Sequence, residues 1–179
     1  MEHYAAWSSN KKPVKEIWSK PPHDFFKVNF DATIREDFST QAAVYRNSNG
    51  LIIKMLYQVR PPYSLVYGEA LVTQLASALA TSLKLDKFIL EGDSSIVVLA
   101  LQNPTFVIDW HIENVINDTI SNFSAKARKI KRSTNFCTHY VIYRATTKVF
   151  PSCISSLVSP LNSIFICGKK DPPPTSPLS

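Results

Sequence analysis

The chain has 179 residues, 45% of them apolar and 19% charged, which is enough for one domain with a buried core and excludes wholesale disorder. Its formal net charge of +6 suits a polyanionic partner such as nucleic acid, although many unrelated proteins carry a similar basic excess. The three cysteines, Cys137, Cys153 and Cys167, are widely spaced and form no C-x-x-C pair, which argues against a disulfide framework and a zinc knuckle and favours a reducing compartment.

The two ends of the chain differ in composition from its centre. Residues 1–24 are polar and carry two tryptophans, Trp7 and Trp18, that we expect to be exposed, so this segment is predicted to be a leader or linker packed at most loosely on the domain. Residues 151–179 form a C-terminal extension whose proline-rich end, DPPPTSPLS, can neither pair in a sheet nor extend a helix. The predicted domain therefore covers residues 25–150.

The first third of this domain has the pattern of an antiparallel meander. Over residues 25–31, apolar and polar side chains alternate with a period of two, which is typical of a strand. A second candidate strand covers residues 41–45. The run Arg46-Asn-Ser-Asn-Gly50 that follows favours a tight turn, because asparagine and glycine tolerate positive φ angles. Residues 51–57 are then predicted to be the third strand.

A long helix and a short buried strand come next. Residues 66–85 are rich in alanine and leucine and contain no proline, so they predict a helix with Glu69 in its first turn. The apolar run at 88–90 predicts a buried strand, and the acidic residues Glu91 and Asp93 follow it directly.

The last part of the domain is predicted to hold three helices and one strand. Residues 96–101 and 109–123 are expected to form helices. Residues 126–132 are expected to form a basic edge strand, and residues 135–150 a last helix. The resulting order is βββαβααβα, which predicts an α/β fold with a five-stranded mixed sheet and helices on its faces. In such a sheet the first and fourth strands are parallel neighbours.

Three acidic residues stand at informative places in this arrangement. Asp31 is predicted to end the first strand and Asp93 to follow the fourth, so both come out at the same edge of the sheet, and the crossing helix can aim Glu69 at that edge. Clustered carboxylates repel one another unless they bind cations or protons. Oxygen ligands without a cluster of histidines and cysteines favour Mg²⁺ or Mn²⁺ over zinc.

Each of these acids also has a purely structural explanation. Asp31 could start a turn, Glu69 could interact with the dipole of its helix, and Asp93 could cap a helix. The joint placement of all three favours a metal site.

Five short motifs that include these acids occur in a fixed order. They are Lys27-Val-Asn-Phe-Asp31-Ala, Arg46-Asn-Ser-Asn-Gly50, Gly68-Glu69-Ala70, Glu91-Gly-Asp93-Ser94 and Asn135-x-x-Thr138-His139. Together they resemble the type 1 ribonuclease H domain of the plant reverse-transcriptase-associated, retroelement-like subgroup. The resemblance covers roughly residues 18–150, and the stretch at 163–174 is similar to the tails of free-standing relatives.

The resemblance implies a metal-dependent endonuclease that cleaves the RNA strand of RNA/DNA hybrids. It places Asp31, Glu69 and Asp93 at the metal-binding catalytic positions, with Asp31 as the ligand that bridges two ions. In that mechanism two Mg²⁺ or Mn²⁺ ions about 4 Å apart activate a water and stabilise the leaving 3′-oxygen. The products would carry a 5′-phosphate and a 3′-hydroxyl.

The sequence departs from the family pattern at several positions. His139 stands where many ribonucleases H have a fourth acid, and imidazole suits Mn²⁺ better than Mg²⁺, although a partly buried helix histidine is the alternative. Residues 133–134 lack the histidine that some members carry before the last helix. The second strand has no glycine at 40–43, and the connection between the helices at 96–101 and 109–123 is too short for a basic handle.

The densest cationic run is a candidate surface for binding nucleic acid. The predicted nucleic-acid-binding residues are Ser94, Lys126, Arg128, Lys129, Lys131 and Arg132. A charged edge strand that prevents aggregation is the alternative explanation.

Two further functions compete with the enzyme. One is a catalytically weak or inactive nucleic-acid-binding module derived from a retroelement, and the other is a decaying fragment of such an element. No stretch approaches the roughly 20 apolar residues of a membrane span, and the N-terminus has no signal-peptide core. We therefore expect a monomer in the cytoplasm or nucleus that acts alone or beside a polymerase.

Overall fold

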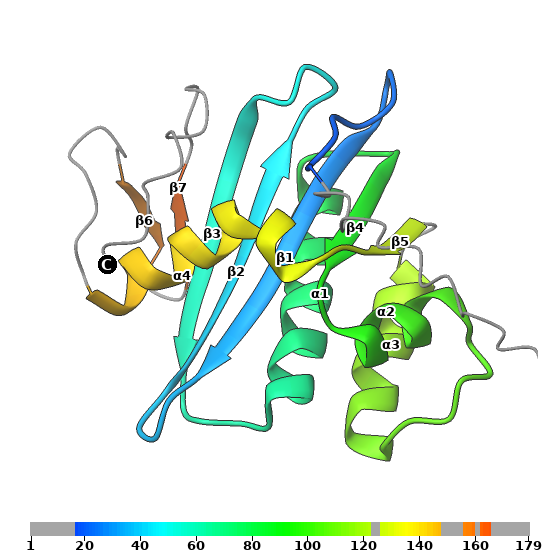
Figure 1. Ribbon diagram of the computed structural model, residues 1–179, viewed down its shortest axis with the longest axis vertical. Coiled ribbons are helices and arrows are strands. Elements are labelled where there is room, and N and C mark those ends of the chain that lie inside the picture. The colour runs from blue at the N-terminus through cyan, green and yellow to red at the C-terminus, as the bar shows by residue number, and fades with distance from the viewer. Residues whose placement is uncertain (1–16, 123–125, 148–155, 160–161, 166–179) are drawn as a thin grey trace, which may run out of the picture.

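A computed structural model describes residues 17–122, 126–147, 156–159 and 162–165 of the chain. Figure 1 shows a sheet with helices on both faces. The elements are β1 (Phe26–Ile34), β2 (Ser39–Arg46), β3 (Ile52–Arg60), α1 (Leu65–Ser82), β4 (Phe88–Gly92), α2 (Ser95–Gln102), α3 (Trp110–Asn122), β5 (Lys126–Lys129), the 3-10 turn η1 (Arg132–Thr134), α4 (Phe136–Thr147), β6 (Ser156–Ser159) and β7 (Asn162–Phe165).

The predicted five-stranded mixed sheet is confirmed. Its strands lie in the order β5-β4-β1-β2-β3, with β1 antiparallel to β2 and parallel to β4. Beyond β3 the sheet continues into β7 and β6, two short antiparallel strands that the sequence did not predict. The basic strand β5 lies at the opposite edge, as predicted.

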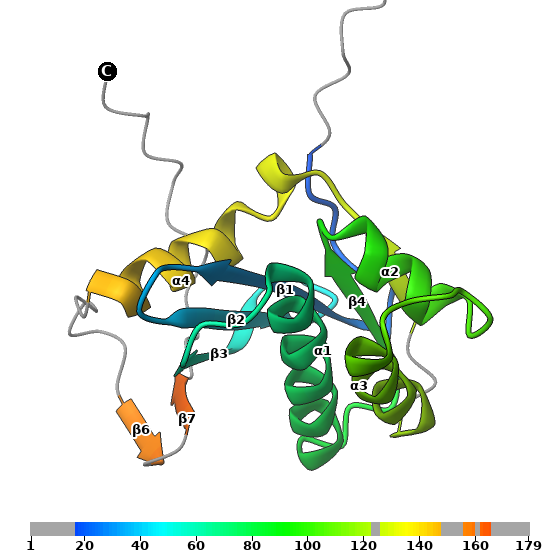
Figure 2. The ribbon, with the colours of Figure 1, turned by 90° about the horizontal axis from the view of Figure 1, so that it is seen from below.

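Helices cover the sheet on both faces. Figure 2 shows α4 on one side of the sheet and α1 and α3 on the other. The larger core lies on the α1 side, where α1, α2 and α3 pack against β1, β2 and β4. On the other side, Val141 and Ile142 of α4 pack against β2 and β3. This burial explains why two residues with low helix propensity lie within a helix.

The register of β1 and β4 decides where the acids lie. Parallel pairing of the two strands ends at Asn29 and Glu91, so Asp31 and Asp93 stand two residues further along each strand. The expectation that Asp31 ends the first strand is wrong, because β1 continues to Ile34 in antiparallel pairing with β2. Asp31 therefore lies just beyond the point where β1 stops pairing with β4, while β1 is still paired with β2.

The helix α1 begins at Leu65, one residue earlier than expected, and ends at Ser82. Ser64 occupies its N-cap position, and the Ser64 hydroxyl accepts a hydrogen bond of 3.3 Å from the backbone N–H of Tyr67. Glu69 therefore lies in the second turn of the helix rather than the first. Because the influence of the helix dipole fades beyond the first turn, a purely dipolar role for Glu69 is weakened.

Close packing makes Gly92 necessary at the end of β4. A Cβ atom on this residue would lie 2.3 Å from the ring of Phe30 on β1, which is too close for any side chain. The glycine thus allows the phenyl ring to pack directly beneath the turn that carries Asp93.

The end of the leader packs more tightly than expected. The Trp18 ring lies 5.1 Å from Lys27 Nζ and 4.7 Å from the guanidinium of Arg46, and Pro21 is buried. The prediction of loose packing is therefore wrong for this part of residues 1–24.

Several predictions made from the sequence fall outside the described residues. These concern residues 1–16, Phe123, the end of the last helix at 148–150, Cys153, Cys167 and the proline-rich tail. Cys137, which is described, is a free thiol. Within the described residues, every helix falls short of the length or hydropathy needed to cross a membrane.

Candidate active site

Three of the predicted ligands converge at the edge of the sheet. Asp31 of β1, Asp93 after β4 and His139 of α4 each offer one ligand atom, and these atoms all lie within 4.8 Å of one another. His139 Nδ1 is 2.5 Å from Asp31 Oδ2, and His139 Nε2 is 4.0 Å from Asp93 Oδ2. Residues far apart in the sequence thus form one cluster.

Asn135 fixes the start of α4 beside this cluster. Its side-chain amide donates a 2.8 Å hydrogen bond to the carbonyl of Phe30, the residue before Asp31. The backbone carbonyl of Asn135 accepts hydrogen bonds from the backbone N–H groups of Thr138, at 3.1 Å, and His139, at 3.2 Å. Asn135 therefore ties the first turn of the helix to β1 and brings His139 next to Asp31.

Glu69 is not one of the three residues whose ligand atoms converge, but its carboxyl group is hydrogen-bonded to Ser94 and interacts with the charges of Asp93 and Asp31. Burial, together with the charges of Asp93 and Asp31, raises the pKa of Glu69 from 4.5 to about 7, although the Ser94 hydrogen bond and the charge of Arg132 act in the opposite direction. Its carboxyl group therefore holds a proton to near-neutral pH.

Ser94 serves Glu69 rather than its own helix. It occupies the N-cap position of α2, but its side chain makes no capping hydrogen bond. The hydroxyl instead interacts with the Glu69 carboxyl group. The sequence had placed Ser94 among the nucleic-acid contacts, and the structure places it within the acidic cluster.

Burial and the histidine act in opposite directions on Asp31. Desolvation raises the pKa of Asp31 overall, although its contact with His139 lowers it. For His139, burial lowers the pKa, but the hydrogen bond and charge of Asp31 outweigh this effect and raise the pKa overall. A protonated imidazole thus offsets part of the negative charge that accumulates at the cluster.

The residues present fit a divalent metal ion. His139 Nε2 is buried and has no hydrogen-bond partner among the described residues, while His139 Nδ1 contacts Asp31 Oδ2. Such an atom is costly to bury unless something else, such as a cation, coordinates it. Carboxylate oxygens from Asp31 and Asp93, with one imidazole nitrogen, form a donor set suited to Mg²⁺ or, better, Mn²⁺.

The basic run lies along the exposed edge of the sheet. Its members Lys126, Arg128, Lys129, Lys131 and Arg132 are all exposed. Lys129 Nζ donates to the hydroxyl of Ser95, and the charge of Arg132 acts on Asp31, Glu69 and His139. The run therefore extends from the β5 edge to the acidic cluster, and its contact with nucleic acid remains a prediction.

Two of the departures from the family pattern concern contact with the substrate. At 40–43 the β2 strand is fully buried, and Ala42 packs in the core beneath α4. The connection between α2 and α3 runs only from Asn103 to Asp109 and holds no basic residue. No basic handle extends from this part of the chain.

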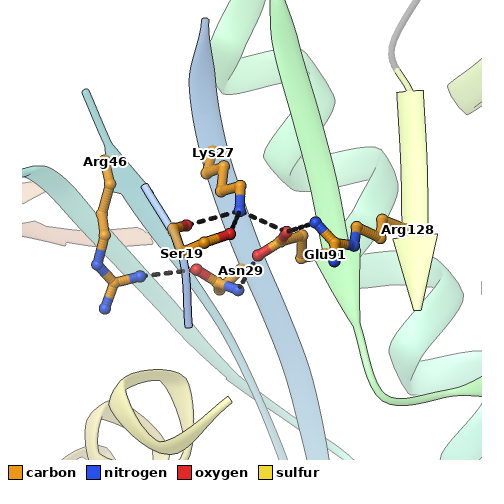
Figure 3. Close-up of polar contacts among 6 residues, drawn as sticks. All are labelled: Ser19, Lys27, Asn29, Arg46, Glu91 and Arg128. Atoms are coloured by element: carbon orange, nitrogen blue, oxygen red, sulfur yellow. Dashed lines mark hydrogen bonds and ion pairs between the residues drawn. The ribbon is translucent and has the colours of Figure 1, made fainter. Parts of the chain in front are cut away.

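A second polar cluster lies near the acids and was not predicted from the sequence. Lys27, Asn29, Arg46 and Glu91 are buried together, and Figure 3 shows their contacts with Ser19 and Arg128. The only available signal was that the polar residues of β1 and Glu91 of β4 share one face of the sheet with Asp31 and Asp93.

Comparisons with known proteins identify the fold. No protein-family model and no curated protein matches the sequence. RNase H1 from the halophilic archaeon Halobacterium salinarum has a similar structure, with a TM-score of 0.63 and 17% identity over 70% of this chain and 99% of that one. LC11-RNase H1, isolated from compost and solved in complex with an RNA/DNA hybrid, has a TM-score of 0.61 and 12% identity over 69% and 97% of the two chains.

A viral polymerase contains the same fold as one of its parts. The foamy viral protease-reverse transcriptase, in complex with an RNA/DNA hybrid, matches with a TM-score of 0.54 and 14% identity over 82% of this chain and 24% of that chain. The described part of the chain therefore has the ribonuclease H fold.

Proposed function

We propose that this chain is a metal-dependent endoribonuclease that cleaves the RNA strand of RNA/DNA hybrids. The observation that carries the proposal is the convergence of Asp31, Asp93 and His139 within 4.8 Å, with Glu69 interacting with the charges of both aspartates. Similar structures bound to RNA/DNA hybrids support this choice of substrate.

The cluster assigns a role to each side chain. Asp31 and Asp93 would hold the metal ions, Glu69 would complete the anionic site after losing its proton, and His139 would act as a neutral fourth ligand. When bound, Mg²⁺ or Mn²⁺ supplies an activated water and stabilises the leaving oxygen. Arg132, whose charge acts on Asp31, Glu69 and His139, would attract the phosphate backbone.

The resemblance to plant retroelement domains is part of the same proposal. It rests on the order of the motifs around Asp31, Glu69, Asp93 and His139. Histidine at the fourth position, together with the missing basic handle, supports a subgroup distinct from free-standing RNase H1.

A catalytically weak nucleic-acid-binding module is the second candidate. It is favoured by the absence of glycine at 40–43 of β2, since in the family that the sequence resembles a glycine-rich second strand lets the hybrid backbone approach closely. This candidate predicts hybrid binding that depends on salt, without cleavage.

A direct assay separates the two candidates. Purified protein is incubated with labelled RNA/DNA hybrid, single-stranded RNA or duplex DNA, in Mg²⁺ or Mn²⁺, alongside Asp31→Asn. We expect cleavage of the hybrid alone, in the RNA strand, and loss of cleavage in the variant. Binding without cleavage in either metal would favour the module, and near wild-type cleavage by Asp31→Asn would exclude the proposed mechanism.

A further inference from the structure

The buried polar cluster next to the acids forms a continuous chain of contacts, which residues of the leader close into a ring. Lys27 Nζ lies 2.8 Å from Glu91 Oε1, and the Asn29 amide donates to Glu91 Oε2 at 3.2 Å. Arg46 donates to the carbonyl oxygen of the Asn29 side chain at 2.7 Å (Figure 3). The four side chains are between 1% and 3% exposed, so these charges lie out of reach of bulk water.

Two leader residues complete the ring. The Ser19 carbonyl accepts a 2.7 Å hydrogen bond from Lys27 Nζ, and the Ser19 hydroxyl lies 3.3 Å from the same nitrogen. With Glu91, these oxygens satisfy the three donors of the ammonium group. The ring of Trp18 packs against the cations of both Lys27 and Arg46, an interaction that strengthens when water is excluded.

The ring lies in line with the candidate metal ligands. Successive side chains of a strand alternate between faces, so Lys27, Asn29 and Asp31 share one face of β1. Glu91 and Asp93 share the same face at the end of β4, because Asn29 pairs in parallel with Glu91. The ring therefore links the two strands one side-chain position before the two acids that must meet at the metal.

Stability alone does not explain such a ring. Apolar residues of similar size commonly stabilise a core as well as a buried ion pair, because burying two charges costs much of what their attraction returns. Glu91 is also unsuited to be a metal ligand, since both of its oxygens contact Lys27 or Asn29. Its place suggests that it orients other residues.

We propose that the ring of Lys27, Asn29, Arg46 and Glu91, closed by Trp18 and Ser19, positions Asp31 and Asp93 for divalent-metal binding. The inference rests on the proposed metal-dependent function. Repulsion between the two acids tends to separate the ends of β1 and β4, and the ring opposes that movement. Trp18 and Ser19 are accordingly positioning residues for the metal ligands.

The test compares metal binding with stability in two variants of the full chain. Lys27→Met/Glu91→Gln removes both charges together and leaves neither partner as an unpaired buried ion. Trp18→Leu keeps the apolar cover but removes the aromatic ring. The control, Lys87→Met/Glu113→Gln, makes the same two changes at exposed positions. Mg²⁺ and Mn²⁺ affinities are measured by calorimetry, and unfolding by urea is measured in parallel.

We expect the charge-pair variant to bind Mg²⁺ about tenfold more weakly or worse, in the range seen when groups that orient metal ligands are removed. Trp18→Leu should weaken binding in the same direction, and the control should bind as the wild type does. In cleavage assays the Mg²⁺ concentration for half-maximal rate should rise while the rate at saturating Mg²⁺ stays within about twofold, since the ligands themselves remain.

The outcomes separate this inference from the proposed function. Unchanged metal affinity in both variants, with or without lower stability, would reduce the ring to a structural element. If the charge-pair variant does not fold, the affinity of Trp18→Leu decides. Weaker metal binding in the variants of a protein that cleaves no hybrid would leave the positioning role intact and reject the nuclease.

Discussion

Glu69 offers the sharpest test of the carboxylate cluster, because its charge should destabilise the fold when no metal is bound. Burial and the neighbouring acids raise the pKa of Glu69 from 4.5 to about 7. The folded protein therefore holds this proton more tightly than the unfolded chain does. The stabilisation is fully present below pH 4.5 and is lost as the pH rises through about 7.

Glu69→Gln should remove that dependence, since the amide is uncharged at every pH and can still accept a hydrogen bond from Ser94. A pKa rise of this size corresponds to about 3 kcal/mol, and partial contact with solvent lowers the expected gain in unfolding free energy to about 1–3 kcal/mol at pH 8. At pH 5, where the folded wild type is already protonated, the gain should fall below about 1 kcal/mol.

The assay is urea unfolding of both proteins at pH 5 and pH 8, with a chelator present and again with saturating Mg²⁺. In Mg²⁺ the wild type should recover or exceed the stability of the variant, because the metal binds the folded state through the carboxylate. Glu113→Gln, which removes an exposed charge from α3, is the matched control. Equal stability differences at the two pH values, or a variant less stable at pH 8, would refute the reasoning.

Three further predictions follow from the geometry. Neutralising Lys129, Lys131 and Arg132 together should weaken hybrid binding and reduce the slope of log affinity against log salt by up to about 3, whereas an unchanged slope would place the substrate elsewhere. Cleavage activity should be higher in Mn²⁺ than in Mg²⁺, and His139→Asp should shift the metal preference toward Mg²⁺. Initial cleavage rates of both proteins in each metal test this, and an unchanged metal preference would show that His139 does not bind the metal. Gly92→Ala should lower the unfolding free energy by about 1–3 kcal/mol in urea, because its Cβ meets a phenyl ring at 2.3 Å, and an unaffected protein would contradict that packing.

Local patterns in the sequence were sufficient for the order of the elements. The alternation over 25–31, the turn residues before Gly50 and the alanine-rich run after residue 65 each specify one element through short-range physics. The predicted parallel pairing of the first and fourth strands was also correct. This pairing predicts that Asp31 and Asp93 lie at the same edge of the sheet, as they do.

The errors arose where distant segments decide the outcome. Asp31 was expected at a strand end, but β1 is prolonged by pairing with β2, which its own sequence does not reveal. Trp18 was assigned to a loose leader because its polar surroundings gave no sign of Lys27 and Arg46 in the sheet below. The pairing of β7 with β3 similarly depends on residues more than a hundred positions apart.

The departures from local rules gather around the acids, and this clustering has a physical meaning. Ser94 stands at an N-cap without capping, Glu69 lies beyond the reach of the helix dipole, and Lys27 occupies a buried position on a core strand. Each departure costs stability that a sequence optimised only for folding would keep. Such costs persist where they serve a site, and here they surround Asp31 and Asp93, whose mutual repulsion itself opposes folding until a cation binds. Among the residues that the structure describes, these departures therefore lie beside the two acids whose repulsion a divalent cation would offset.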